Sequence, residues 1–254
     1  MRGAKILYLL PLTGIDEEER KRREKLANSF VTHEKNKVIV EAIDDGPVSL
    51  ESTVEEYMSV PSILRKLVAV QDKYDAAIIG CAMDAGLAPA RELLEIPVVG
   101  PLEASVGVTL TLGESFSIIT ALDSIVPAIW RTLNTYAMHH KCTSVRVINF
   151  SVLDIIECNE EVVEAFLREA KRVVENEKAS TVILGCMAMA FLLLDEIVKD
   201  KIDIPIVNPA KISIKVAEIL LSLNLMQSRV SYPRPKNYEN LKISLLSSID
   251  TLHG

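Results

Sequence analysis

The chain contains one supersecondary pattern twice, once in each half. In each copy an apolar, β-prone run ends in Gly-Cys and leads into a segment of helical character, as AIIGC at 77–81 and VILGC at 182–186. Both copies then reach Ile-Pro, a second short apolar run and another Pro, at 96–101 and 204–209. An internal repeat constrains the fold strongly, because both copies must build the same unit. It also places one cysteine at an equivalent position in each half.

Strand and helix signals alternate along the chain, which is typical of βαβ units and a parallel sheet. The apolar runs are continuous, as expected for strands buried on both faces. We predict an α/β fold of two pseudo-symmetric domains, each a short parallel sheet flanked by helices. The first domain comprises 1–102 plus 209–254 and carries Cys81, and the second comprises 103–208 and carries Cys186. Because ligands bind outside the carboxyl ends of parallel strands, we expect the active site in the interdomain cleft.

The individual elements follow from the pattern. Strands are predicted at 4–10, 37–42, 76–80, 98–99, 115–120, 144–150, 181–185 and 206–207. Helices are predicted at 17–31, 60–70, 87–94, 103–112, 124–138, 160–177, 189–198, 211–223 and 240–249. Pro61 suits the first turn of the second helix. The basic run Lys21, Arg22 and Arg23 alternates with acidic residues, which predicts a solvated helix face.

Composition excludes several classes of partner. The formal net charge of −7 argues against nucleic acid and anionic membrane surfaces. No apolar run approaches the roughly 18 residues of a membrane span. The four cysteines form no CxxC pair, and no histidine lies near Cys81 or Cys186, so no metal site is predicted. We expect reduced thiols, a cytoplasmic location and a small-molecule substrate, and we leave a homo-oligomer open.

The repeated cysteines differ from the other two. We interpret Cys142 and Cys158 as small buried apolar residues, with Asn159 as a helix N-cap. Cys81 and Cys186 each follow a strand and precede a helix, where free N–H groups and the helix dipole favour an anion. Such positions lower a thiol pKa from about 8.5 toward neutrality. One thiolate could then remove a proton from a carbon acid while the other thiol returns one to the opposite face.

Several stretches resemble the Asp/Glu/hydantoin racemase superfamily, and within it the hydantoin racemase branch. The resemblance runs from about residue 4 to about residue 235 and includes DGPVSLES at 45–52, IPVVGPLEAS at 96–105 and both Gly-Cys strand ends. It implies cofactor-independent racemisation or epimerisation of a carbon alpha to a carbonyl, with Cys81 and Cys186 as the acid/base pair. The expected substrate is a 5-substituted hydantoin or a related cyclic amide.

The resemblance also implies residues that bind the substrate. Pro11 and Thr13 in the loop after the first strand, Ser52 and Thr120 would line the cleft. Asp84 would either orient a substrate group or cap a helix, and Ser52 has the same second interpretation.

The sequence departs from its relatives in three places beside these residues. Relatives commonly carry Asn-Pro-Asn where this chain has Leu10-Pro11-Leu12. Met83 stands where relatives often have glycine, and Met187-Ala188-Met189 replaces the common Ala-Gly-Met. The added bulk should narrow the cleft or make it more apolar.

Two other interpretations stay open at the level of sequence. One is an isomerase or decarboxylase of a small diacid that uses a single cysteine. The other is a non-catalytic small-molecule binding domain that keeps its cysteines as core or redox groups.

Overall fold

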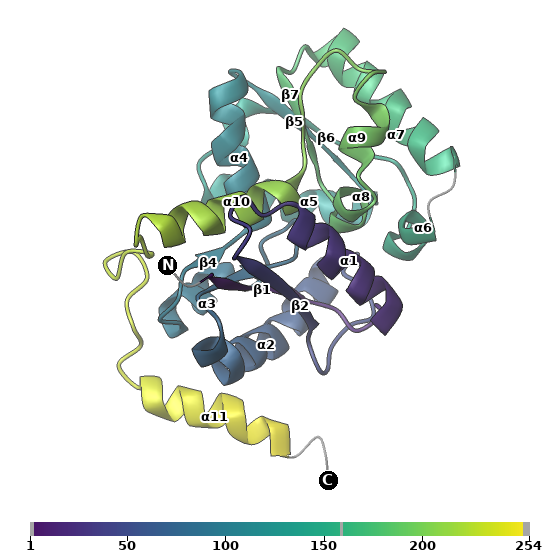
Figure 1. Ribbon diagram of the computed structural model, residues 1–254. Coiled ribbons are helices and arrows are strands. Elements are labelled where there is room, and N and C mark those ends of the chain that lie inside the picture. Colours follow the sequence, from purple (N-terminus) through teal and green to yellow (C-terminus); the bar gives the residue numbers. More distant parts are fainter. Residues whose placement is uncertain (1–2, 158–159, 251–254) are drawn as a thin grey trace.

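The computed structural model, which describes residues 3–157 and 160–250, contains two parallel four-stranded sheets covered by helices (Figure 1). The first sheet has the order β2-β1-β3-β4 and the second the order β6-β5-β7-β8, and each pair of neighbouring strands is parallel. The two orders are equivalent once β1 is matched with β5 and β3 with β7, which confirms the predicted pseudo-symmetric α/β fold. The first sheet contains β1 (Lys5–Leu10), β2 (Lys37–Ala42), β3 (Ala76–Ile79) and β4 (Val98–Val99). The second contains β5 (Phe116–Thr120), β6 (Cys142–Val147), β7 (Thr181–Leu184) and β8 (Ile206–Val207).

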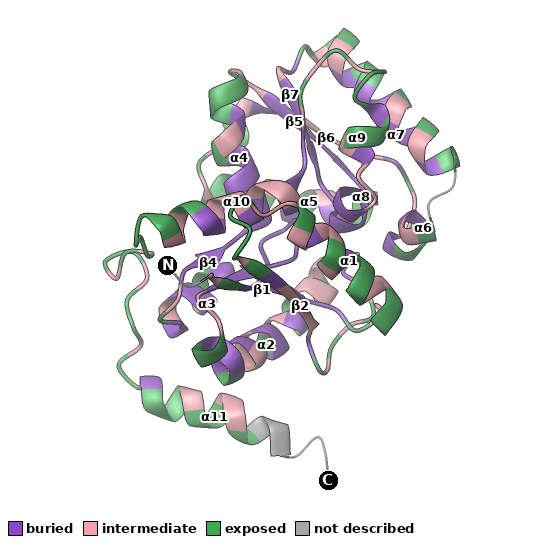
Figure 2. Cartoon of the chain, viewed as in Figure 1, coloured by how far each residue is buried: buried purple, intermediate pink, exposed green. Residues whose placement is uncertain are grey.

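The central strands form the core of each half. Every residue of β3, β5 and β7 is buried, as is β1 after Lys5 (Figure 2). Continuous burial explains why these strands read as unbroken apolar runs instead of alternating ones.

Helices cover both sheets and connect them. The chain passes from β4 to β5 through α4 and returns from β8 through α10, which packs on α4, β3, β4 and α8. We propose a domain division at these two crossings, near residues 102 and 209. No helix within 3–157 or 160–250 is long and apolar enough to cross a membrane. The helices are α1 (Glu17–Ser29), α2 (Thr53–Val70), α3 (Leu87–Leu93), α4 (Pro101–Leu112), α5 (Val126–Thr135), α6 (Val152–Glu157), α7 (Glu160–Arg172), α8 (Met187–Phe191), α9 (Leu194–Val198), α10 (Pro209–Ser222) and α11 (Tyr238–Asp250).

The predicted start of α2 at residue 60 was wrong. The helix begins at Thr53, because Ser52 accepts a hydrogen bond from the Glu55 N–H at 3.3 Å while the Glu55 carboxylate accepts one from the Glu51 N–H at 2.8 Å. This reciprocal capping fixes the first turn. Pro61 therefore lies inside the helix and not in its first turn.

Three other predictions need correction or lie outside the described residues. The segment predicted as one helix over 189–198 is two short helices, since Leu193 takes a left-handed conformation with φ 59°. Helix α6 was not predicted. Cys158 and Asn159 lie outside the residues that the structure describes.

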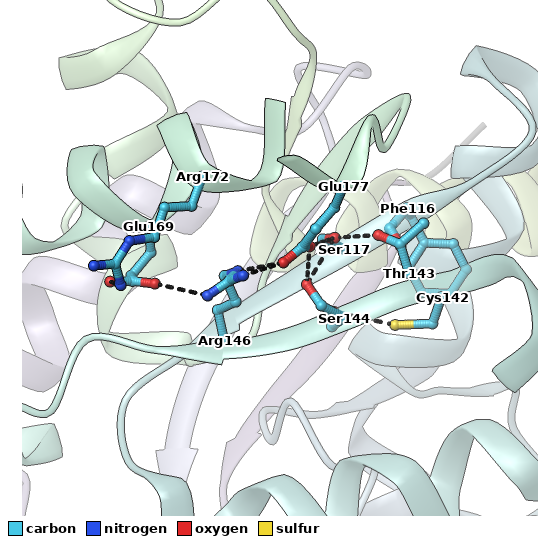
Figure 3. Close-up of polar contacts among 9 residues, drawn as sticks. All are labelled: Phe116, Ser117, Cys142, Thr143, Ser144, Arg146, Glu169, Arg172 and Glu177. Atoms are coloured by element: carbon cyan, nitrogen blue, oxygen red, sulfur yellow. Dashed lines mark hydrogen bonds and ion pairs between the residues drawn. The ribbon is translucent and has the colours of Figure 1, made fainter. Parts of the chain in front are cut away.

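A polar cluster fastens the end of α7 to the second sheet (Figure 3). Arg146 of β6 binds Glu177 through Nε at 2.6 Å and Glu169 of α7 through Nη1 at 3.3 Å, and Ser144 also donates to Glu177. The neighbouring Cys142 thiol donates to the Ser144 carbonyl at 3.3 Å and is buried. This setting agrees with a structural interpretation of Cys142.

Candidate active site

Cys81 and Cys186 line one cavity of about 50 Å³. Cys81 follows β3 and Gly80 in the first half, and Cys186 follows β7 and Gly185 in the second. The topology thus brings the two repeated thiols to a common space at the carboxyl ends of both sheets. The cavity is lined by Pro11, Leu12, Arg23, Leu50, Gly80, Cys81, Ala82, Met83, Ile125, Val152, Gly185, Cys186, Met187 and Ala188.

The glycine before each thiol is required by close packing against the neighbouring strand. The Gly80 N–H donates to the Leu9 carbonyl at 2.8 Å, and the Gly185 N–H donates to the Ile119 carbonyl at 2.7 Å. A Cβ at Gly80 would lie 2.4 Å from the Tyr8 ring, and one at Gly185 would lie 2.6 Å from Ile118. The two sites therefore share their packing as well as their sequence.

Burial dominates the acidity of both thiols. Desolvation raises the pKa of Cys81 to about 12, although hydrogen bonds from the N–H groups of Met83 and Ala85 lower it. Desolvation also raises the pKa of Cys186, although N–H groups at the start of α8 and the positive charge of Arg23 lower it. The expected lowering of the thiol pKa values toward neutrality was therefore wrong. A few N–H groups at the start of a five-residue helix do not offset the loss of solvent around a buried sulfur.

Arg23 is a lining residue that the sequence interpretation missed. It was assigned to a solvated face, yet it is only 2 % exposed. Its Nε donates to the Glu19 carboxylate at 2.8 Å and its guanidinium lies 5.2 Å from the centre of the Phe191 ring. The signal available in the sequence was Ala27, which lies four residues later on the same helix face and is also buried.

The predicted binding residues divide into one that lines the cavity and four that lie outside its described lining. Pro11 contributes directly. Thr13 is exposed, and its hydroxyl donates to the Pro47 carbonyl at 3.2 Å. Ser52 caps α2, as described above. Thr120 is fully buried behind the second thiol, where its hydroxyl donates to the Gly185 carbonyl at 2.8 Å.

Asp84 acts as a cap for a helix that starts elsewhere in the chain. Its carboxylate accepts hydrogen bonds from the N–H groups of Leu102 at 2.9 Å and Glu103 at 2.8 Å, at the start of α4, and from the Tyr136 hydroxyl at 2.7 Å. Burial nevertheless raises the pKa of Asp84 to about 6. With these partners occupied, the carboxylate supports the loop that carries Cys81.

Hydrogen bonds between the halves close the cavity beside Leu50, Ile125 and Val152. The Ser124 hydroxyl donates to the Glu51 carbonyl at 2.5 Å, and the Val152 N–H donates to the Glu51 carboxylate at 2.8 Å. A volume of about 50 Å³ holds a few water molecules, whereas small-molecule sites typically enclose about 300–1,000 Å³. The cavity is therefore smaller than a typical small-molecule site, and we expect the two halves to move apart when a substrate enters.

No group of three or more potential metal ligands occurs among the His, Cys, Asp and Glu residues that the structure describes. The chemistry available in the cavity is that of two thiols and one guanidinium.

Known proteins share the sequence pattern and the fold of this chain. The model of the family "Asp/Glu/Hydantoin racemase" matches residues 20–217. A hydantoin racemase of Pseudomonas sp. (strain NS671) is 32 % identical over 76 % of this chain and 78 % of its own length. A hydantoin racemase of Rhizobium meliloti is also 32 % identical, over 82 % of this chain and 87 % of its own. The crystal structure of allantoin racemase from Pseudomonas fluorescens superposes with a TM-score of 0.85 at 27 % identity, covering 91 % of this chain and 97 % of that one.

Proposed function

This chain belongs to the Asp/Glu/hydantoin racemase family, and we propose that it racemises a 5-substituted hydantoin by proton transfer between Cys81 and Cys186. The observation that carries the proposal is the pair of thiols, at equivalent positions of the two halves, on one cavity. The reaction needs no cofactor, and the reduced thiols suit the cytoplasm.

The proposed reaction moves one proton at each step. One cysteine, as thiolate, takes the proton from the carbon between the ring nitrogen and the ring carbonyl. The C–H electron pair moves into the carbonyl and gives an enolate. The other cysteine, as thiol, donates its proton to the opposite face of that carbon and becomes the thiolate. The reverse reaction uses the same two groups with their roles exchanged.

The cavity lining favours an apolar substituent on the ring. Leu12, Leu50 and Val152 present aliphatic side chains, and Met83 and Met187 place thioethers near the thiols. A second candidate substrate is allantoin, which the similarity to allantoin racemase supports. A polar ureido group would have to pair with the few hydrogen-bonding groups of this lining, so we place alkyl and arylalkyl hydantoins first.

The test is racemisation of an enantiopure 5-alkylhydantoin in D2O. Optical rotation should decay enzymatically, and the product should carry one deuterium on the reacting carbon. Allantoin is assayed in parallel to rank the two substrates. Absence of enzymatic exchange with a broad panel of hydantoins, allantoin included, would refute the proposed substrate class.

Single substitutions test the two-thiol mechanism. Cys81→Ser and Cys186→Ser should each abolish racemisation, since a serine hydroxyl is a far weaker acid than a thiol. Cys142→Ser is the matched control, because Cys142 is also buried but lies in β6, outside the cavity lining. If either Cys81→Ser or Cys186→Ser stayed largely active, a one-cysteine mechanism, as in an isomerase or decarboxylase of a small diacid, would replace this proposal.

A further inference from the structure

Arg23 is the one charged side chain in the described lining of the cavity. Apart from the two thiols, the other lining side chains are aliphatic or thioether groups or belong to glycine and proline. Glu19 pairs with this buried cation at 2.8 Å, but burying a charge remains unfavourable unless its other donors are also hydrogen-bonded.

The contacts of Arg23 fix its orientation but leave part of its hydrogen-bonding capacity unused. Glu19 accepts from Nε at 2.8 Å, and the Phe191 ring packs 5.2 Å from the guanidinium carbon. The Nη2 atom is buried and has no hydrogen-bond partner. An unsatisfied guanidinium N–H inside a protein is destabilising, so a ligand oxygen that enters the cavity would gain a strong hydrogen bond there.

Among the described lining side chains, only Arg23 carries N–H or O–H donors. The loop after β1 reads Leu10-Pro11-Leu12, which supplies no side-chain donor, and the Thr13 hydroxyl is directed to the Pro47 carbonyl. The charge of Arg23 also acts on Cys186, which places the guanidinium near the reacting sulfur.

We propose that Arg23 is a catalytic residue whose Nη2 donates a hydrogen bond to the carbonyl oxygen next to the reacting carbon. This inference rests on the proposed function. When the thiolate removes the proton, the C–H electron pair moves onto that oxygen, and the fixed cation stabilises the negative charge there. When the second thiol returns a proton, the pair moves back to carbon and the oxygen is again a neutral carbonyl. Donors aimed at developing charge in a dry site act most strongly in the transition state.

The test compares four variants, Arg23→Met, Arg23→Lys, Arg23→Ala and Lys21→Met, on a neutral 5-alkylhydantoin. Arg23→Met keeps much of the side-chain length and removes the charge and donors. Arg23→Lys keeps the charge but not the planar fork. Lys21→Met is the matched control, because Lys21 is on the same helix, is exposed and pairs with Glu17 at 2.5 Å.

We expect Arg23→Met to lower kcat by about 100- to 1,000-fold, the effect typical of losing one oxyanion donor, with a smaller change in KM. Arg23→Lys should be intermediate, and Lys21→Met should match the wild type. Addition of millimolar methylguanidinium to Arg23→Ala should restore part of the lost rate. If Arg23→Met does not fold, as judged by circular dichroism, kcat of folded Arg23→Lys decides the question.

Two results would overturn the inference. One is a wild-type kcat in folded Arg23→Met, or in folded Arg23→Lys where Arg23→Met does not fold. The other is a loss confined to KM for hydantoins with a carboxylate substituent, which would assign Arg23 to recognition of the substituent. Failure of the wild-type protein to racemise hydantoins is a different outcome, which would refute the proposed function itself.

Discussion

Substituting the glycine before each thiol should damage stability and catalysis together. In Gly185→Ala the new Cβ would meet Ile118 Cγ2 at 2.6 Å and Thr120 Cβ at 2.8 Å. Ordinary van der Waals contact begins at 3.4 Å, so the Cβ must retreat by about 0.8 Å, from 2.6 to 3.4 Å. Gly80→Ala meets the Tyr8 ring at 2.4 Å and must retreat by about 1.0 Å, from 2.4 to 3.4 Å.

The displacement sets the expected magnitudes. Overpacking of a tight core typically destabilises by about 1–3 kcal/mol. For a chain of this length, each kcal/mol lowers Tm by about 2–4 °C. A misplacement near 1 Å costs up to about 100-fold in rate, since proton transfer requires the sulfur to contact the reacting carbon's hydrogen. Each variant should therefore lose about 2–12 °C in Tm and about 10- to 100-fold in kcat.

Gly107→Ala provides the matched control. Gly107 is an exposed residue inside α4, and a Cβ there would meet nothing within 4 Å. Alanine is the better helix former, so this variant should be more stable by about 0.5–1 kcal/mol and fully active. Thermal unfolding and racemisation kinetics of the three variants are measured side by side. Wild-type Tm and kcat in Gly80→Ala and Gly185→Ala would refute the packing argument.

Three further predictions concern pH and closure. The pKa of Asp84 is about 6 in the folded protein, against an ordinary value of 3.8. Between these two pH values the folded protein binds a proton on Asp84 that the unfolded chain does not bind. The contribution of Asp84 to the free energy of unfolding is therefore lost as pH rises from about 4 to about 6. Urea unfolding of Asp84→Asn should lack that part of the pH dependence, and an identical profile would contradict it. Because burial raises the pKa of Cys81 to about 12 and also raises that of Cys186, kcat/KM should rise by about tenfold per pH unit between pH 7 and 9 if one of them acts as thiolate, and a plateau below pH 8 would contradict the raised thiol pKa. Glu51→Ala removes the hydrogen bond to the Val152 N–H, so iodoacetamide should alkylate Cys186 roughly 2- to 10-fold faster, while an unchanged rate would show that this contact does not limit opening.

The elements that were predictable from sequence are those whose pattern reflects the core alone. Strands β1, β3, β5 and β7 are buried on both faces, so they are built from continuous apolar runs, and their positions could be predicted from the sequence. The two Gly-Cys strand ends could also be predicted, because the equivalent topology of the two sheets requires the same close packing at both positions.

The parts that failed depend on contacts between distant segments. Asp84 caps α4 rather than its own helix, and Arg23 is buried because Phe191, 168 positions later, packs on it. The contact of Asp84 leaves no periodic signal near that residue, and the only signal near Arg23 is Ala27, four residues later on the same helix face. The capping pair Ser52 and Glu55 indicates the start of α2 in the local sequence. The prediction instead placed the start next to Pro61.

The raised thiol pKa values bear on which substrate suits this cavity. A thiol of high pKa is rarely ionised at neutral pH, so few molecules carry the thiolate. That thiolate is, however, a stronger base than a thiolate whose pKa is lowered by a long helix. Its faster proton removal therefore partly offsets its small population. Such a base still requires a carbon acid whose anion is stabilised, because a cavity of about 50 Å³ offers room for only a few water molecules around the developing charge. A hydantoin ring spreads that charge onto its carbonyl oxygen, and the unpaired Nη2 of Arg23 is the described lining's cationic donor for it. A free amino acid would instead bring both a carboxylate and an ammonium group into a lining that is otherwise aliphatic. The described lining has no carboxylate with which the ammonium group could pair. The small, apolar cavity and the single cation of its described lining therefore favour a neutral cyclic amide over a zwitterion.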